Sequence, residues 1–293
     1  MPEHVVLFDT DLGTDVDDAL ALAVLLGTPE VELRGVTTVY GDTVLRARLA
    51  ARYAALAGRP LVAAAGRELT LSGREVWWAG HEGTLHDRLE REQVSDVDGV
   101  EVLVSSVLAE PGLVDVIAVG PLTNVAAAIE QDARFAPSVR HLWIMGGAFE
   151  TDEPEHNLRS DVTAANRVFA AGIPTTVASL DATRRVVMRE EQLGVIARSG
   201  PLGAALERDI HQWWAFWNET WNVPHDPVVV LAMTRPELFS FSPFGTVTVI
   251  ADGPEEGVSR FVPDPAGTVR YIDGIDTAAV AEAIVAGVVA AQA

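Results

Sequence analysis

Residues 5–22 read VVLFDTDLGTDVDDALAL, an apolar run that leads into a crowded acidic loop and then into a second apolar run. The first run is typical of a buried β-strand, and the second has the length and the alanine–leucine content of a helix. Five aspartates lie within ten residues, at positions 9, 11, 15, 17 and 18. Like charges at this density repel one another and raise each other's pKa. The stretch therefore predicts a strand–helix unit with a functional site where the strand ends.

The same alternation of strand and helix patterns continues along the chain. Apolar runs of strand length occur at 4–10, 31–41, 114–120, 141–147 and 175–181, and helical patterns occur at 15–27, 123–131, 161–172 and 188–199. Continuous apolar strands separated by amphipathic helices indicate a parallel sheet covered on both faces. We expect an α/β fold in a single domain, residues 1–293, built on an open, mostly parallel, Rossmann-like sheet with helices on both faces. The polar segment from about 66 to 100 is expected to be an insertion over a site at the carboxyl ends of the strands.

The composition excludes several classes of protein. The chain of 293 residues carries a formal net charge of -21, which disfavours nucleic acids and membrane surfaces as partners. It has no run of eighteen uncharged apolar residues and its first residues do not resemble a signal peptide, so we expect a cytoplasmic enzyme. The absence of cysteine excludes thiolate nucleophiles and soft metal sites. All 21 basic residues are arginine, and the lack of lysine excludes Schiff-base and P-loop chemistry.

The aspartate cluster has more than one explanation. One or two acids at a helix start often serve as a cap, but five are too many for capping alone. Hard oxygen ligands without sulfur favour Ca2+ or Mg2+. An EF-hand does not fit, because Thr14 and Leu20 occupy the positions of its glycine and its bidentate acid. Residues 9–11 are similar to the nucleophile motif of haloacid-dehalogenase-type phosphatases, which stay an alternative although the lysine of that family is missing. The histidines of HEGTLH, residues 81–86, are five apart and do not share the face of a zinc-binding helix.

Six motifs occur in a characteristic order between residues 5 and 230: DTDLGTDVDDALAL, TTVYGD, AVGPLTNVAAAI, IMGG, EPEHN and PHDP. Through them the chain resembles the inosine–uridine-type nucleoside hydrolases, which split a ribonucleoside into ribose and nucleobase. The resemblance implies one Ca2+ held by Asp11, Asp18, Asp226 and the backbone carbonyl of Thr123. It also implies a small-molecule nucleoside substrate, and we expect a homodimer or homotetramer.

The resemblance also assigns residues to the sugar. Asp17 matches the acid that holds a ribose hydroxyl, Glu155 and Asn157 match the residues at the ribose 5′ end, and Asp9 would orient the other acids. The chain departs from the family in one respect near the acidic pair at 17–18, because two extra residues bring an additional acid, Asp15, that has no assigned role.

A second departure is Asp42, which stands where the family commonly has a ribose-contacting asparagine. A carboxylate can accept hydrogen bonds from sugar hydroxyls but cannot donate them.

The reaction and the nucleobase suggest further residues. Cleavage of an N-glycosidic bond builds positive charge on the ribose, which nearby carboxylates stabilise. Asp11 is expected to act as general base on the attacking water, and His225 to protonate the departing base. Six of the seven tryptophans fall in two segments, at 77–78 and 213–221, and we expect at least one from each to line the base pocket, with Trp78 and Trp217 as the candidates. His81 matches a pocket histidine of the family. A ribose-binding protein without catalytic activity is the remaining alternative.

Overall fold

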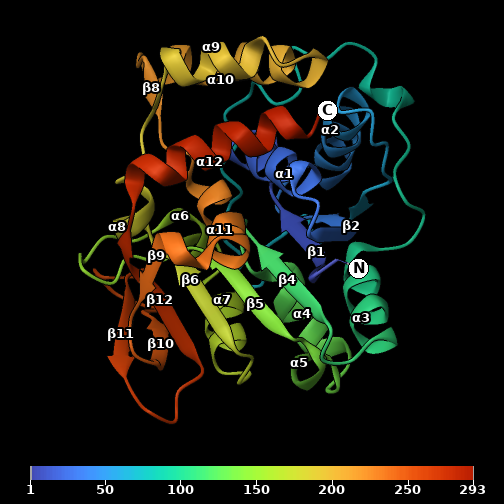
Figure 1. Cartoon of the computed structure of the whole chain (residues 1–293). Coiled ribbons are helices and arrows are strands. Elements are labelled where there is room, and N and C mark those ends of the chain that lie inside the picture. The colour runs from blue at the N-terminus through green and yellow to red at the C-terminus, as the bar shows by residue number, and fades with distance from the viewer. Residues whose placement is uncertain (1, 293) are drawn as a thin grey trace.

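The computed structural model describes residues 2–292, and its centre is one twisted ten-stranded sheet (Figure 1). Neighbouring strands follow the order β3, β2, β1, β4, β5, β6, β12, β10, β11, and β9 pairs with β12 outside this path. The strands are β1 (His4–Thr10), β2 (Val31–Thr38), β3 (Ala64–Ala65), β4 (Val114–Ala118), β5 (His141–Met145), β6 (Thr175–Ala178), β9 (Phe239–Phe241), β10 (Gly245–Val249), β11 (Ser259–Pro263) and β12 (Val269–Ile275). Pairing is parallel from β3 to β12 and antiparallel at β9, β10 and β11. A separate two-stranded sheet joins β7 (Met188–Arg189) to β8 (Trp221–Asn222).

Helices cover both faces of this sheet (Figure 1). One face carries α1 (Asp17–Gly27), α2 (Thr43–Leu56), α11 (His225–Thr234) and α12 (Thr277–Ala290), and the other carries α3 (Gly99–Ala109), α4 (Thr123–Gln131), α5 (Phe135–Ser138) and α7 (Val162–Phe169). The shorter α6 (His156–Ser160) and α8 (Leu180–Thr183) follow β5 and β6. Beyond α12 lies a further layer formed by α9 (Glu190–Ala197) and α10 (Pro201–Trp217). The 3-10 helices are η1 (Leu89–Arg91) and η2 (Pro236–Leu238).

The pleat of β1 explains why the strand sequences are continuously apolar. Phe8 belongs to the core under α1 and α11, while its neighbour Leu7 belongs to the core under α3 and α4, and both are fully buried. Full burial of such a side chain contributes about 1.5–3 kcal/mol, so both faces of the strand require helices over them. The predicted fold class, an open and mostly parallel sheet with helices on both faces, is confirmed.

Four of the five predicted strands end two or three residues earlier than their apolar runs, with the largest differences at β2 and β6. The strand expected at 31–41 stops at Thr38, because Tyr40 and Gly41 turn the chain with φ values of 69° and 79°. The strand expected at 175–181 stops at Ala178, where α8 begins two residues later. The segment predicted as an insertion, from 66 to 100, contains η1 and the start of α3 but is otherwise without regular structure. None of the helices among residues 2–292 is long and apolar enough to cross a membrane.

Candidate active site

A cavity of about 850 Å³ opens at the carboxyl ends of the parallel strands. Its acidic floor comes from the loop after β1, from the first turn of α1 and from the start of α11. The ends of β4 and β5 contribute Val119 and Met145, and α6 begins beside them. Of the sequence-predicted residues, the cavity wall contains Asp11, Asp17, Asp18, Glu155, Asn157, Trp217, His225 and Asp226.

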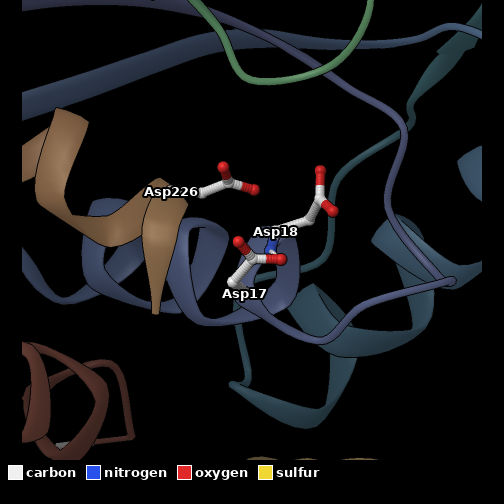
Figure 2. A group of neighbouring side chains, drawn as sticks. All are labelled: Asp17, Asp18 and Asp226. Atoms are coloured by element: carbon white, nitrogen blue, oxygen red, sulfur yellow. Dashed lines mark hydrogen bonds between the residues drawn. The ribbon is translucent and has the colours of Figure 1, made fainter. Parts of the chain in front are cut away.

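Three carboxylates face one another on this floor (Figure 2). Asp17 and Asp18 are the first two residues of α1, and Asp226 is the second residue of α11. Each side chain offers an oxygen that lies within 4.8 Å of the other two, and all three residues are at most 5% exposed. The Thr10 hydroxyl donates a hydrogen bond to Asp18 Oδ1. The fold therefore brings Asp226 next to Asp17 and Asp18, which lie more than 200 positions earlier in the sequence.

Burial and mutual repulsion raise the pKa of Asp17, Asp18 and Asp226 well above the usual range of a carboxyl group. Burial is the larger cause in each case, and the neighbouring acids add to it. Asp15, the additional acid of this chain, also lines the cavity, and burial raises its pKa to about 7. A divalent cation among these oxygens would remove both costs, since it replaces lost hydration and neutralises the repulsion.

Asp9 is buried next to the cavity floor but does not line the cavity. Its side chain is fully buried, and Oδ1 accepts hydrogen bonds from Thr37 Oγ1 at 2.5 Å and from Asn124 Nδ2 at 2.7 Å. Its second oxygen, Oδ2, is buried without a hydrogen-bond partner. Burial raises the pKa of Asp9 to about 7. A buried carboxylate oxygen without a partner is costly, and a proton or a nearby cation would satisfy it.

Glu155 and Asn157 hold the backbone around the start of α6. Glu155 caps the helix, and its carboxylate accepts from the amides of Asn157, Leu158 and Gly147. Asn157 Nδ2 donates to the Val119 carbonyl at 2.6 Å, which ties α6 to the end of β4. Both side chains are buried and both line the cavity. Their positions in the cavity wall are thus fixed by main-chain contacts.

His225 stands in the cavity wall at the first position of α11. Its Nδ1 lies 2.7 Å from the Thr183 hydroxyl. Burial lowers the pKa of His225 to about 4, and the positive charge of Arg184 lowers it further. The expectation that His225 protonates the departing base assumed the ordinary histidine pKa of 6.5; with a pKa of about 4 the imidazole is neutral at pH 7.

Aromatic side chains form the outer part of the cavity. The lining tryptophans are Trp77, Trp213, Trp217 and Trp221. Trp77 is 41% exposed and Trp217 is 53% exposed, which leaves large apolar faces open to a ligand. Trp78, the candidate named from the sequence, lies elsewhere: its ring covers the Arg46 guanidinium at 4.9 Å and contacts Gly41, where any Cβ would clash with the indole.

Three other predicted residues do not line the cavity. Asp42 is an exposed N-cap of α2 and accepts from the Leu45 amide at 2.9 Å. His81 places Nε2 2.9 Å from the Thr14 carbonyl oxygen. Thr123 is the buried first residue of α4, and its hydroxyl donates to Asp161 at 2.7 Å.

One wall residue that sequence reasoning missed is Arg46, whose side chain is 1% exposed and lines the cavity. Its guanidinium donates to the carbonyls of Tyr40 and Leu12 and thereby fixes the loop that carries Asp11. Its positive charge also opposes the rise in the pKa of Asp18. In the sequence Arg46 is one of four arginines between positions 46 and 59, and no pattern distinguishes it.

Comparisons with known proteins agree with this geometry. The family model described as "Inosine-uridine preferring nucleoside hydrolase" matches residues 6–282. The probable uridine nucleosidase 2 of Oryza sativa subsp. japonica is 32% identical over 272 residues, which cover 86% of this chain and 80% of the relative. The non-specific ribonucleoside hydrolase RihC of Escherichia fergusonii is 28% identical over 254 residues, which cover 81% of each.

Solved structures show the same relationship. A plant nucleoside hydrolase superposes with a TM-score of 0.88 at 27% sequence identity, covering 98% of this chain and 99% of the other. The purine-preferring ribonucleoside hydrolase from Gardnerella vaginalis shares the fold, with a TM-score of 0.86 at 23% identity over 98% and 99% of the two chains. Together with the family match over nearly the whole chain, these findings show that the protein is an N-glycosyl hydrolase of the inosine-uridine preferring nucleoside hydrolase family.

Proposed function

We propose that this nucleoside hydrolase depends on Ca2+ and cleaves both purine and pyrimidine ribonucleosides. The observation that carries the metal assignment is the buried group of Asp17, Asp18 and Asp226 at the cavity floor. Their donor atoms are all carboxylate oxygens, which suit Ca2+ better than softer metals. Asp11 from the cavity wall and the Thr123 carbonyl at the start of α4 complete the proposed ligand set with Asp18 and Asp226.

The bound cation would promote deprotonation of the attacking water and anchor the sugar hydroxyls. We assign Asp11 as the base that accepts the water proton while the water oxygen bonds to C1′ of the ribose. The bond between C1′ and the base nitrogen breaks, and its electron pair leaves with the nucleobase. The carboxylates of the floor stabilise the positive charge that develops on the ribose ring. Asp17 accepts a hydrogen bond from a ribose hydroxyl, and Glu155 and Asn157 contact the 5′ end.

The base is proposed to lie against the aromatic part of the cavity. Trp77 and Trp217 offer exposed faces from two different segments, so the base contacts are assigned to them and not to Trp78. The neutral His225 ring donates a hydrogen bond through its N–H to the departing base; the base takes its proton from solvent, and Asp11 returns to solvent the proton it accepted from the attacking water. Relatives named for uridine and for ribonucleosides without base preference support a broad substrate range.

The decisive experiment is turnover of a nucleoside panel by the purified protein before and after treatment with a chelator. Inosine and uridine should each yield free nucleobase and one equivalent of reducing sugar, and Ca2+ should restore the activity that the chelator removes. Asp11→Asn should lose nearly all activity, whereas Asp252→Asn, at an exposed turn, should not. Full turnover by metal-stripped protein would refute the metal assignment. Release of phosphate from phosphate esters would favour the phosphatase alternative, and binding without turnover the non-catalytic one.

Two further expectations belong to this proposal, a cytoplasmic location and a homodimeric or homotetrameric assembly. Light scattering coupled to size-exclusion chromatography would test the assembly.

A further inference from the structure

The segment His81–His86, with the sequence HEGTLH, is not part of the wall of the main cavity, yet the structure anchors it firmly. Glu82 is only 7% exposed although it is charged and lies in an irregular loop. Its Oε1 accepts from the Thr14 hydroxyl at 3.0 Å and from the Ala79 amide at 2.9 Å, and its Oε2 accepts from the Gly80 amide at 2.8 Å. A buried carboxylate with three donors is a fixed structural point.

One of the three donors to Glu82, Thr14, belongs to the acidic loop. Thr14 lines the cavity and precedes Asp15. The Thr14 hydroxyl donates a hydrogen bond to Glu82, and the Thr14 carbonyl oxygen lies 2.9 Å from His81 Nε2. Two consecutive residues of the segment therefore contact the same threonine. The acidic loop, which leads to Asp17 and Asp18, is therefore hydrogen-bonded to the segment 77–86 through Thr14.

The other end of HEGTLH is anchored to α10. His86 Nε2 lies 2.9 Å from Asp209 Oδ2, which also accepts from the Tyr53 hydroxyl at 2.7 Å. All three residues are buried. Asp209 lies one helical turn before Trp213, which lines the cavity. The segment thus connects the acidic floor to the helix that carries one of the two aromatic walls.

The second aromatic wall is carried by the same segment. Trp77 stands two residues before Ala79, whose amide Glu82 holds, and the Trp77 amide donates to the Tyr40 hydroxyl at 2.8 Å. The His81 ring packs edge-on against Trp213 and Phe216, with ring centroids 5.9 and 5.3 Å apart. Contacts from one short loop therefore reach the acidic loop and both walls.

We propose that Glu82 is a positioning residue for base recognition: it fixes Trp77 and the acidic loop relative to each other, so that the base and the ribose fit at the same time. This inference rests on the proposed function for its substrate. An irregular loop has no ladder of backbone hydrogen bonds, so side-chain contacts hold it in place, and Glu82 is the side chain that bonds both the acidic loop at Thr14 and the backbone after Trp77 at Ala79 and Gly80. If Trp77 shifts relative to the acidic loop, the contacts to the base weaken, while the contacts to the ribose and the metal stay in place.

The test compares Glu82→Gln with Glu75→Gln, an identical change at an exposed position two residues before Trp77. Glutamine keeps only one acceptor oxygen, so whichever way its amide group is turned, it loses the hydrogen bond from either the Ala79 or the Gly80 amide. We expect the KM for inosine to rise about tenfold, as for loss of one stacking contact, and kcat to change less than about twofold. Inhibition by D-ribose and the Kd for Ca2+ should stay within about twofold of the wild type, and Glu75→Gln should match the wild type throughout.

A second readout follows Trp77 itself. Acrylamide quenching of tryptophan fluorescence, corrected with Trp77→Phe, should increase for Trp77 in Glu82→Gln and stay unchanged in Glu75→Gln. An unchanged inosine KM with unchanged quenching would overturn the proposal, and so would equal losses in inosine, D-ribose and Ca2+ binding, which indicate general unfolding of the site. If Glu82→Gln does not fold, Thr14→Val decides the question with Thr14→Ser as the variant that retains the hydroxyl. If the wild type does not hydrolyse nucleosides, the proposed function fails, while the quenching result still decides the role of Glu82.

Discussion

Replacement of Asp226 by asparagine is expected to change the stability of the protein in opposite directions with and without Ca2+. The side chain is buried, and one of its oxygens lies within 4.8 Å of one oxygen of Asp17 and one of Asp18. Two unit charges 4.8 Å apart cost about 3.5 kcal/mol at an effective dielectric constant of about 20. Asp226 has two such neighbours, but the metal-free protein relieves part of the repulsion by retaining a proton. We therefore expect Asp226→Asn to stabilise the metal-free protein by about 2 kcal/mol.

The same substitution removes a ligand of the proposed cation, so the gain from Ca2+ should disappear. A cation present at about 100 times its Kd stabilises the wild type by about 2.7 kcal/mol through mass action alone. Thermal unfolding followed by circular dichroism would measure both effects. For a chain of this size, 1 kcal/mol corresponds to a shift of about 2 °C in Tm. Asp226→Asn should thus unfold about 4 °C above the wild type in EDTA and show little response to CaCl2.

Asp252→Asn is the matched control, because Asp252 is exposed in a turn, and it should follow the wild type in both buffers. Destabilisation of Asp226→Asn in EDTA would refute the reasoning from charge repulsion. A wild type whose Tm does not respond to Ca2+ would refute the metal assignment independently.

Three further predictions concern the sugar, the base and the pH dependence of stability. Because Asp17 is proposed to bind a ribose hydroxyl, kcat/KM for 2′-deoxyinosine should be at least about 100-fold below that for inosine, and equal values in a steady-state assay would contradict this role. His225→Ala should slow inosine more than a nitrophenyl riboside, whose leaving group needs no proton, whereas equal loss on both substrates would make His225 a structural residue. Burial lowers the pKa of His141 from 6.5 to about 4. Between pH 6.5 and pH 4, the unfolded chain therefore binds a proton at His141 more readily than the folded protein does. Stability should therefore fall as the pH drops from about 7 towards 4, and the His141 contribution between pH 7 and pH 5 is about 2 kcal/mol. His141→Asn should lose less stability than the wild type over that interval in urea titrations, and an unchanged difference between the two would exclude this explanation.

The sequence predicted the fold well because its strands are buried on both faces. A strand such as β1 needs an apolar residue at every position when helices cover both sides, and that makes the run VVLF easy to recognise. The strand of the 31–41 run was predicted too long, because the apolar pattern continues into a turn. There Tyr40 adopts a positive φ, a conformation that depends on tertiary contacts and leaves little trace in the sequence.

The floor of the site was also accessible from the sequence, since its acids lie in short motifs that begin helices. The tryptophans that line the cavity were not. Trp77 and Trp78 are adjacent, and which of them faces the cavity depends on the path of an irregular loop without a period of its own. On α10, by contrast, the helical period separates the tryptophans: Trp214 is buried and bonds Asn222 through Nε1, while Trp217 is exposed at the cavity.

The arrangement of two helix starts explains how the fold tolerates its acidic floor before any cation binds. Asp17 and Asp18 begin α1, Asp226 lies in the first turn of α11, and all three residues line the cavity, so both helices begin at its wall. The partial positive charge of each helix start stabilises a nearby carboxylate by about 0.3–1 kcal/mol, and up to about 2 kcal/mol when partly buried. That is less than the repulsion within the group, so the dipoles reduce the cost without removing it. The remaining imbalance favours a cation and, in the transition state, a positively charged ribose. A variant that relieves the repulsion should for the same reason stabilise the fold and weaken catalysis.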